Sequence, residues 1–296
     1  MGVGSLVDVL FEPFLDNAFM QRALLAGVLV AVLCAIVGTY VVLRGLAFIG
    51  DALAHGVLPG VAGSVIFGFS SLLGAAVGAG VMIGGVSLVT KRSKLSSDTA
   101  IGLLFVGLLA AGVVMVSSTD RLTGDIDAIL FGEFLGVDAT DIRVLAVALV
   151  AVVGIVVWSY RPFAVLCFDP DLARAMGYRA DIHHRSMLVL VAATIVVSFQ
   201  SVGSLLVFGM LLGPAGAGAL IARRIGVMMI WASLIGSLSV YVGLLISYHW
   251  DWAAGASVVV VASGLFFAIL IGVEVRRAVS LRRVSSPGVS SPGVSG

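Results

Sequence analysis

Charged residues are scarce in this 296-residue chain: they make up 11% of it, whereas hydrophobic residues make up 60%. The mean hydropathy of +1.18 lies far above that of soluble globular domains, so composition excludes that class. A membrane span takes about 20 apolar residues, which leaves room for roughly eight to ten crossings. We therefore predict an all-α, polytopic bundle of membrane helices. The net charge of +1 gives no reason to expect a nucleic-acid partner.

Cysteines and catalytic motifs are also few. Cys34 and Cys167 fit neither a disulfide nor a metal-ligand spacing, and we expect Cys34 to pack inside a span. The chain has no Gly-x-x-x-x-Gly-Lys-Ser/Thr loop, so it cannot bind ATP in the P-loop manner. Gly-x-Ser-x-Gly and His-Glu-x-x-His are missing too. These absences argue against an enzyme, and we expect no permanently bound cofactor.

Apolar runs predict nine membrane helices, or eight if a short segment interrupted at Gly213-Pro214 does not cross. Residues 1–21 should form an amphipathic segment in the membrane interface, and residues 22–276 the transmembrane domain. Residues 277–296 contain a tandem Ser-Ser-Pro-Gly-Val repeat and should be a disordered cytoplasmic tail. The expected spans lie near residues 23–43, 46–68, 72–90, 99–117, 142–160, 187–207, 208–222, 226–248 and 253–274.

The distribution of basic residues predicts the orientation. With the N-terminus outside and the C-terminus in the cytoplasm, all but three of the 17 Lys and Arg residues are cytoplasmic. The three exceptions are Arg22, Arg121 and Arg143. The outer side is acidic instead, mainly in one loop that we interpret as solvated. Its acids are Asp120, Asp125, Asp127, Glu133, Asp138 and Asp141.

Asp51 and His55 lie within the second predicted span, where a carboxylate costs on the order of 3 kcal/mol at the bilayer centre. Their i, i+4 spacing puts both side chains on one helix face, with room for an ion between them. Carboxylate oxygen and imidazole nitrogen together suit Mn²⁺, Zn²⁺ or Fe²⁺. From the residues alone, an ion or proton site and a mutually neutralising intrahelical hydrogen bond are about equally favoured.

A short helix is predicted in the longest cytoplasmic loop, from Asp169-Pro170 to Gly177. Leu172, Ala173 and Met176 would form an apolar side, which indicates either a docking element or packing on the membrane surface. The adjacent His183 and His184 cannot clamp one ion together, and we interpret them as solvated loop residues.

Five stretches, taken together, resemble the permease subunit of the manganese, zinc and iron family of ABC importers. Each piece alone is weak, but the combination is specific and extends in order from about residue 11 to residue 275. The stretches are Phe11–Phe14 with Met20–Gly27; Gly38–Gly45; Gly50–His55 with Leu58–Gly60; Asp98–Gly102; and Phe168–Pro170 with Ala173–Gly177.

The resemblance implies a fold related to type II ABC importer permeases, in the plasma membrane of a prokaryote. It implies a homodimer in the lipid bilayer, two cytoplasmic ABC ATPase subunits and an extracytoplasmic metal-binding protein. Asp51 and His55 would handle the transported Mn²⁺ or Zn²⁺, or iron. The loop after the fifth span would dock on the ATPase through Phe168, Asp169, Pro170, Leu172, Ala173, Met176 and Gly177.

Two other functions stay open at this point. A secondary metal transporter would need acids or histidines on several spans, whereas Asp51 is the only carboxylate deep in any predicted span. An ABC permease for a metal chelate or a vitamin has the same general build, but it should have a wide path without paired metal ligands.

Overall fold

A computed structural model describes residues 11–93, 95–118 and 134–284, and these ranges contain helices and no strands. Nine helices in them are long and apolar enough to cross a membrane, which confirms the predicted polytopic α-bundle. The elements are α2 (Ala18–Leu43), α3 (Ala47–Gly56), α4 (Leu58–Phe67), α5 (Ser71–Arg92), α6 (Ser97–Ser117), η1 (Phe134–Gly136), α8 (Ala139–Trp158), α9 (Tyr160–Phe168), α10 (Pro170–Ala175), α11 (Ala180–Val202), α12 (Ser204–Ile221), α13 (Ile225–Trp250) and α14 (Ala254–Val284).

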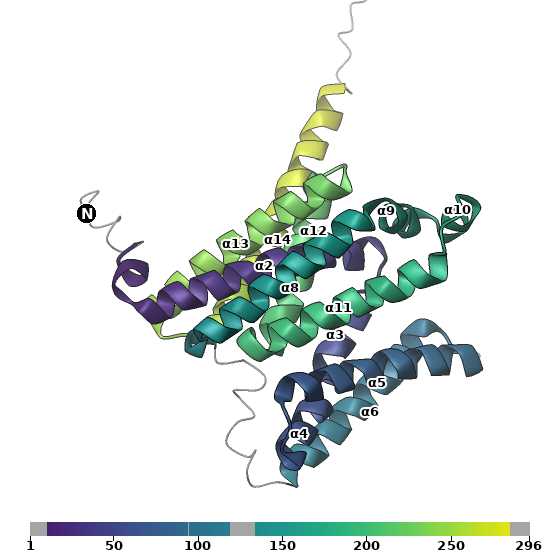
Figure 1. The fold of residues 1–296 in the computed structure, drawn as a ribbon. Coiled ribbons are helices and arrows are strands. Elements are labelled where there is room, and N and C mark those ends of the chain that lie inside the picture. The colour runs from purple at the N-terminus through teal and green to yellow at the C-terminus, as the bar shows by residue number, and fades with distance from the viewer. Residues whose placement is uncertain (1–10, 94, 119–133, 285–296) are drawn as a thin grey trace, which may run out of the picture.

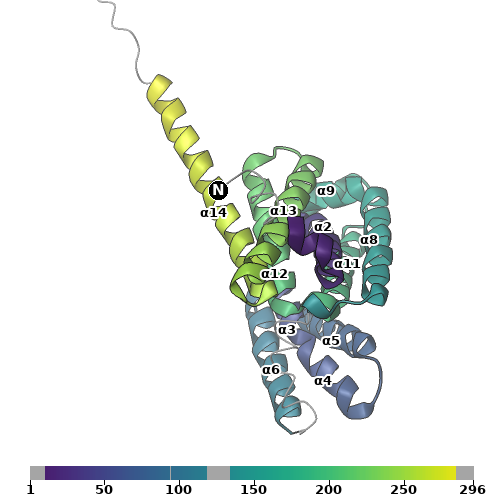
Figure 2. The ribbon, with the colours of Figure 1, turned by 90° about the vertical axis from the view of Figure 1, so that its left-hand side faces the viewer.

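The helices form two groups (Figure 1). In the larger group, α2 packs against α12 and α13, which also contact α14, while α8 and α11 cover another side of α2. In the smaller group, α4, α5 and α6 pack together below α11, and α3 links them to the larger group (Figure 2). Helix α2 forms much of the core: Val30, Ala31 and Cys34 are fully buried, as expected for Cys34.

The turn from α2 to α3 is fixed by a glycine. Gly45 has a φ of 64°, in the left-handed region that glycine adopts at a lower cost than other residues do. The Gly45 N–H donates to the Val42 carbonyl, and the Leu46 N–H donates to the Val41 carbonyl, which is the Schellman pattern. The end of α2 and the start of α3 are therefore joined without a flexible linker.

The second span, Ala47–Phe67, is divided into α3 and α4 at Val57. Pro59 is near the start of α4 and has no N–H to donate to the His55 carbonyl four residues earlier. Such an interruption is tolerated in a membrane helix where neighbouring helices enclose the backbone. Here α6 does so: a methyl group on its Gly112 would lie 3.2 Å from the Pro59 nitrogen.

Glycines bring α4 and α5 into backbone contact. A Cβ at Gly60 would collide with the Gly74 carbonyl, and one at Gly78 would lie 2.7 Å from the Gly56 carbonyl oxygen. The Gly74/Gly78 pair thus acts as a small-xxx-small packing motif. Gly80 and Gly84 face open space, so this second pair does not pack helices within the chain.

Several predicted boundaries differ from the structure. The sixth and seventh spans meet at Gly203 (φ 81°) rather than at 207/208, and α12 continues through Pro214 without a break. Pro214 is buried beside α13, whose enclosure of the helix makes the lost hydrogen bond tolerable. Residues 11–16 are helical, and the first span begins at Ala18. Helix α14 extends to Val284, into the predicted tail; the rest of that tail lies outside the described residues.

Candidate metal site and coupling helix

The Asp51 and His55 side chains meet on one face of α3, as predicted. His55 Nδ1 lies 3.3 Å from Asp51 Oδ1 and 3.1 Å from the Asp51 backbone carbonyl oxygen. The side chains touch directly, so the space for an ion that the spacing predicted between them is absent in this conformation. An ion could only bind beside the pair, or after the pair had separated.

The hydrogen bonding of His55 suits it to metal binding. A backbone carbonyl only accepts hydrogen bonds, so Nδ1 must carry the proton that is donated to Asp51. The lone pair of neutral imidazole is then on Nε2. Metal-ligating histidines commonly use this arrangement, in which one ring nitrogen donates to a carboxylate or carbonyl and the other binds the metal.

The remaining faces of α3 are enclosed. A Cβ at Gly50 would lie 2.9 Å from Leu211 of α12, and one at Gly56 would lie 3.3 Å from Met82 of α5. The face that carries Asp51 and His55, the candidate metal-pair face, is different. His55 and Asp51 are 27% and 33% exposed, and Phe105 of α6 packs edge-on against the imidazole with a ring-centroid distance of 5.3 Å. The pair is thus accessible from one direction.

Two ligands from one chain are too few to hold Mn²⁺ or Zn²⁺ firmly, since Zn²⁺ sites generally have at least three protein ligands. Within the residues that the structure describes, no group of three or more His, Cys, Asp or Glu side chains could hold a metal ion. Within the described residues, Asp51 and His55 are therefore not joined by a third ligand of these four types.

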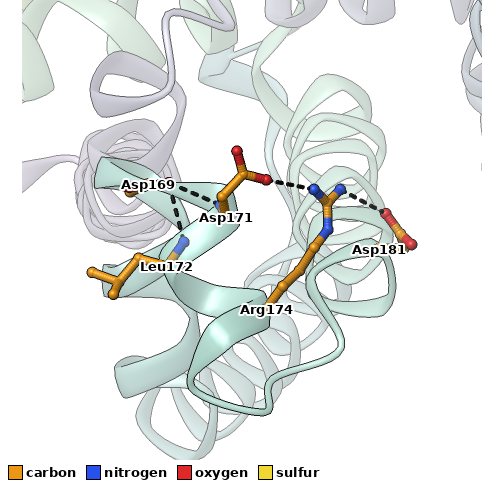
Figure 3. A network of polar contacts seen from close by, with 5 residues as sticks. All are labelled: Asp169, Asp171, Leu172, Arg174 and Asp181. Carbon is orange, nitrogen blue, oxygen red and sulfur yellow. Dashed lines mark hydrogen bonds and ion pairs between the residues drawn. The ribbon is translucent and has the colours of Figure 1, made fainter.

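The second predicted site is a helix between α8 and α11. Helix α10 begins at Pro170, and Asp169 caps it by accepting hydrogen bonds from the N–H groups of Asp171 (2.8 Å) and Leu172 (3.1 Å). Gly177 ends it with a φ of 83°, so both predicted boundaries are confirmed. Arg174 pairs with Asp171 at 2.7 Å and with Asp181 of α11 at 3.7 Å (Figure 3), which ties α10 to the following span.

One member of the predicted docking face points the other way. Ala173 is only 1% exposed, because it packs with Leu166 of α9 and Ala180 of α11. It therefore anchors α10 within the chain and is not available to a partner. The exposed apolar side chains are Phe168 (74%), Leu172 (50%) and Met176 (56%).

Sequence reasoning missed the role of Arg44 and misassigned His184. Arg44 Nη1 donates to the Leu166 carbonyl at 2.6 Å, and Nη2 lies 3.2 Å from His184 Nδ1. His184 is half-buried in the first turns of α11 and is not a solvated loop residue. The adjacent His183 packs edge-on against Phe163 and Tyr178. The two contacts of Arg44 join positions more than 100 residues apart, so no local pattern could reveal them.

A cavity of about 770 Å³ lies beside Arg44, between α11 and the α3–α5–α6 group. Its wall combines charged ends of helices with apolar side chains from the spans. Among the residues that line it are Arg44, Phe48, Thr90, Asp98, Asp181 and Arg185. The ends of α2 and α5 and the starts of α6 and α11 therefore meet at one side of the bundle, as the charge distribution predicted.

Two of the predicted outer acids have a structural role. Asp138 caps α8 by accepting from the N–H groups of Asp141 (2.9 Å) and Thr140 (2.7 Å), and the Asp141 carboxylate accepts from the Asp138 N–H. These backbone donors hold the pKa of Asp138 below its ordinary value. The other four acids of that loop lie outside the described residues.

The described residues thus combine nine candidate spans, an Asp–His pair in an interrupted helix and a capped helix between two spans. The model of the ABC 3 transport family matches residues 16–273, and the chain belongs to this family.

Relatives and a solved structure agree with this assignment. The chain is 35% identical to the manganese transport system membrane protein MntC of Halalkalibacterium halodurans, over 86% of this chain and 88% of that protein. It is also 35% identical to a probable iron transport system membrane protein of Haemophilus influenzae, over 91% and 98%. The structure of PsaBC from Streptococcus pneumoniae in complex with Fab superimposes with a TM-score of 0.81 at 31% identity, covering 89% of this chain and 95% of that chain.

Proposed function

We propose that this protein is the membrane-spanning subunit of an ATP-driven importer of a divalent transition metal, manganese or zinc, or iron. The Asp51–His55 pair carries this proposal, because it places a carboxylate in a membrane span beside an imidazole whose Nδ1 bonds to the Asp51 carbonyl, which leaves Nε2 to bind a cation. Relatives named for manganese and iron transport support the choice of metal. The partners are an ABC ATPase in the cytoplasm and an extracytoplasmic metal-binding protein, in a prokaryotic plasma membrane with the N-terminus outside.

The transported ion passes through a site shared by two copies of the chain. One copy offers two side-chain ligands, and its metal-pair face is partly exposed. Two copies related by a twofold axis would offer four side-chain ligands when their α3 helices approach, and fewer when they separate. This change in ligand number would let the transporter take an ion from its binding protein and then release it inward.

Metal uptake into proteoliposomes that contain the complete transporter tests the site. Asp51→Asn removes the ligand charge and His55→Ala removes the imidazole, and each should reduce uptake by at least tenfold. Asp16→Asn and His249→Ala are matched controls, because both residues are exposed near the ends of helices. Normal Mn²⁺ and Zn²⁺ uptake by both site variants would show that the pair is only an internal hydrogen bond.

Helix α10 is proposed to dock in a groove on the ATPase. Its exposed apolar residues would enter the contact, and Leu172→Glu should abolish metal-stimulated ATP hydrolysis and uptake together. Leu95→Glu is the control, since Leu95 is similarly exposed (45%) in another loop on the same side of the bundle. Unchanged uptake with Leu172→Glu would assign α10 a different role.

The same preparation distinguishes the other candidate functions. A secondary transporter would import the metal without the ATPase, driven by a proton or sodium gradient. A chelate or vitamin permease would import the complexed compound and would not respond to Asp51→Asn. We expect uptake of the free ion that requires both ATP and the ATPase subunit.

A further inference from the structure

We propose that Arg44 is the positioning residue that transmits movement of α10, the proposed coupling helix, to Asp51 and His55, the proposed metal pair. This inference rests on the proposed role of α10, and it identifies the connection between the two sites. Arg44 lies between them: it is the C-cap of α2, and α3 begins at Ala47 with Asp51 about one turn further along.

On one side, Arg44 holds the segment that carries α10. The acceptor of its 2.6 Å hydrogen bond is the carbonyl of Leu166, whose buried side chain packs with Ala173 of α10 and Ala180 of α11. The Arg174–Asp181 ion pair and the Tyr178 N–H bond to the Ala173 carbonyl strengthen this unit. Helices α9 and α10 and the start of α11 should therefore move together.

On the other side, Arg44 is rigidly attached to α3. The Schellman turn at Gly45 fixes the direction in which α3 leaves α2, so a displacement of Arg44 shifts the first turn of α3. Asp51 and His55 are on that short helix, which ends at Gly56. A small tilt of α3 would therefore move the metal ligands of two facing copies apart or bring them closer together.

A cavity lies next to this link. The cavity borders Arg44 and the start of α3, where Phe48 is 70% exposed at its wall, although α11 packs against α3 and α5 elsewhere. At the start of α3, the cavity takes the place of some of the packing that could transmit movement of the α9–α10–α11 unit. The hydrogen bonds of Arg44 to Leu166 and His184 connect the end of α2 directly to α9 and α11 at the edge of this cavity.

His184 Nδ1 must carry no proton if it is to accept the hydrogen bond from Arg44, because a guanidinium only donates hydrogen bonds. His184→Asn can keep an acceptor on the side chain, whereas His184→Leu removes it. Similarly, Arg44→Lys keeps the charge with a single donor group, and Arg44→Gln removes the charge and the forked geometry. These pairs separate loss of the link from loss of packing.

Single spin labels measure the transmission. Each label is attached to a cysteine introduced at an exposed position, either Ala175 on α10 or Phe48 on α3. The native Cys34 and Cys167 are replaced by alanine so that they are not labelled. In the complete transporter, ATP hydrolysis in the presence of vanadate, which traps ADP once phosphate has left, should change the spectra of both labels. With Arg44→Gln, the label at 175 should still respond while the label at 48 should not, and metal uptake should fall at least tenfold with basal ATP hydrolysis retained.

The controls and the contrary outcomes are distinct. Arg223→Gln changes an exposed arginine between α12 and α13 and should leave both responses intact. His184→Asn should transmit better than His184→Leu, and Arg44→Lys better than Arg44→Gln. A normal response at 48 with Arg44→Gln would overturn the inference. A label at 175 that is silent without any Arg44 change would instead refute the coupling role of α10, and this inference with it.

Discussion

Replacing Gly60 by alanine tests the packing that holds the span of Asp51 and His55 in place. The added Cβ would collide with the Gly74 carbonyl and would lie 2.9 Å from the Gly78 nitrogen. Both obstacles are backbone atoms of α5, which cannot rotate away as a side chain can. Helices α4 and α5 would have to separate, and such overpacking costs about 1–3 kcal/mol.

This cost should lower the thermal unfolding midpoint by roughly 2–12 °C, if the relation for soluble domains of similar size holds. Intrinsic tryptophan fluorescence of the detergent-solubilised protein measures the midpoint. Gly80→Ala is the matched control: it lies on the same helix as Gly74, and a Cβ there would meet nothing within 4 Å. The control should be neutral or stabilised by up to about 1 kcal/mol through helix propensity.

Equal unfolding temperatures for the two variants would refute the close approach of α4 and α5. A functional consequence follows as well. The division between α3 and α4 lies next to Gly56 and Gly60, so separation at Gly60 should disturb the Asp51–His55 pair. We expect Gly60→Ala to reduce metal uptake even at temperatures where the protein remains folded.

Two further predictions concern thiol chemistry and topology. Burial raises the pKa of the Cys167 thiol to about 11, with Arg44 acting in the opposite direction; alkylation at pH 8 should therefore be about 100-fold slower than for a thiol of pKa 9, and it should accelerate steeply up to pH 10. A rate equal to that of a free thiol would show that Cys167 is exposed. In intact cells, a cysteine at Arg92 should resist a membrane-impermeant reagent while one at Trp252 reacts; labelling at position 92 from outside would reverse the predicted orientation.

The sequence alone was sufficient to predict what depends on local pattern. Apolar run length determined nine spans, because each membrane crossing needs about 20 predominantly apolar residues. The i, i+4 spacing brought Asp51 and His55 together, and Asp169-Pro170 and Gly177 set the ends of α10. These features require only helix geometry and backbone preferences within a few residues.

Only the tertiary structure decided which way side chains face and which distant residues meet. Nothing local shows that Ala173 points inward while Leu172 points outward, since both are apolar and adjacent. The Gly60–Gly74 contact, the joint at Gly203 and the bonds of Arg44 to Leu166 and His184 likewise depend on how whole helices pack. In a chain that is 60% hydrophobic, most sides of a membrane helix are apolar enough to contact either lipid or protein. Apolar periodicity therefore cannot determine how the helices pack.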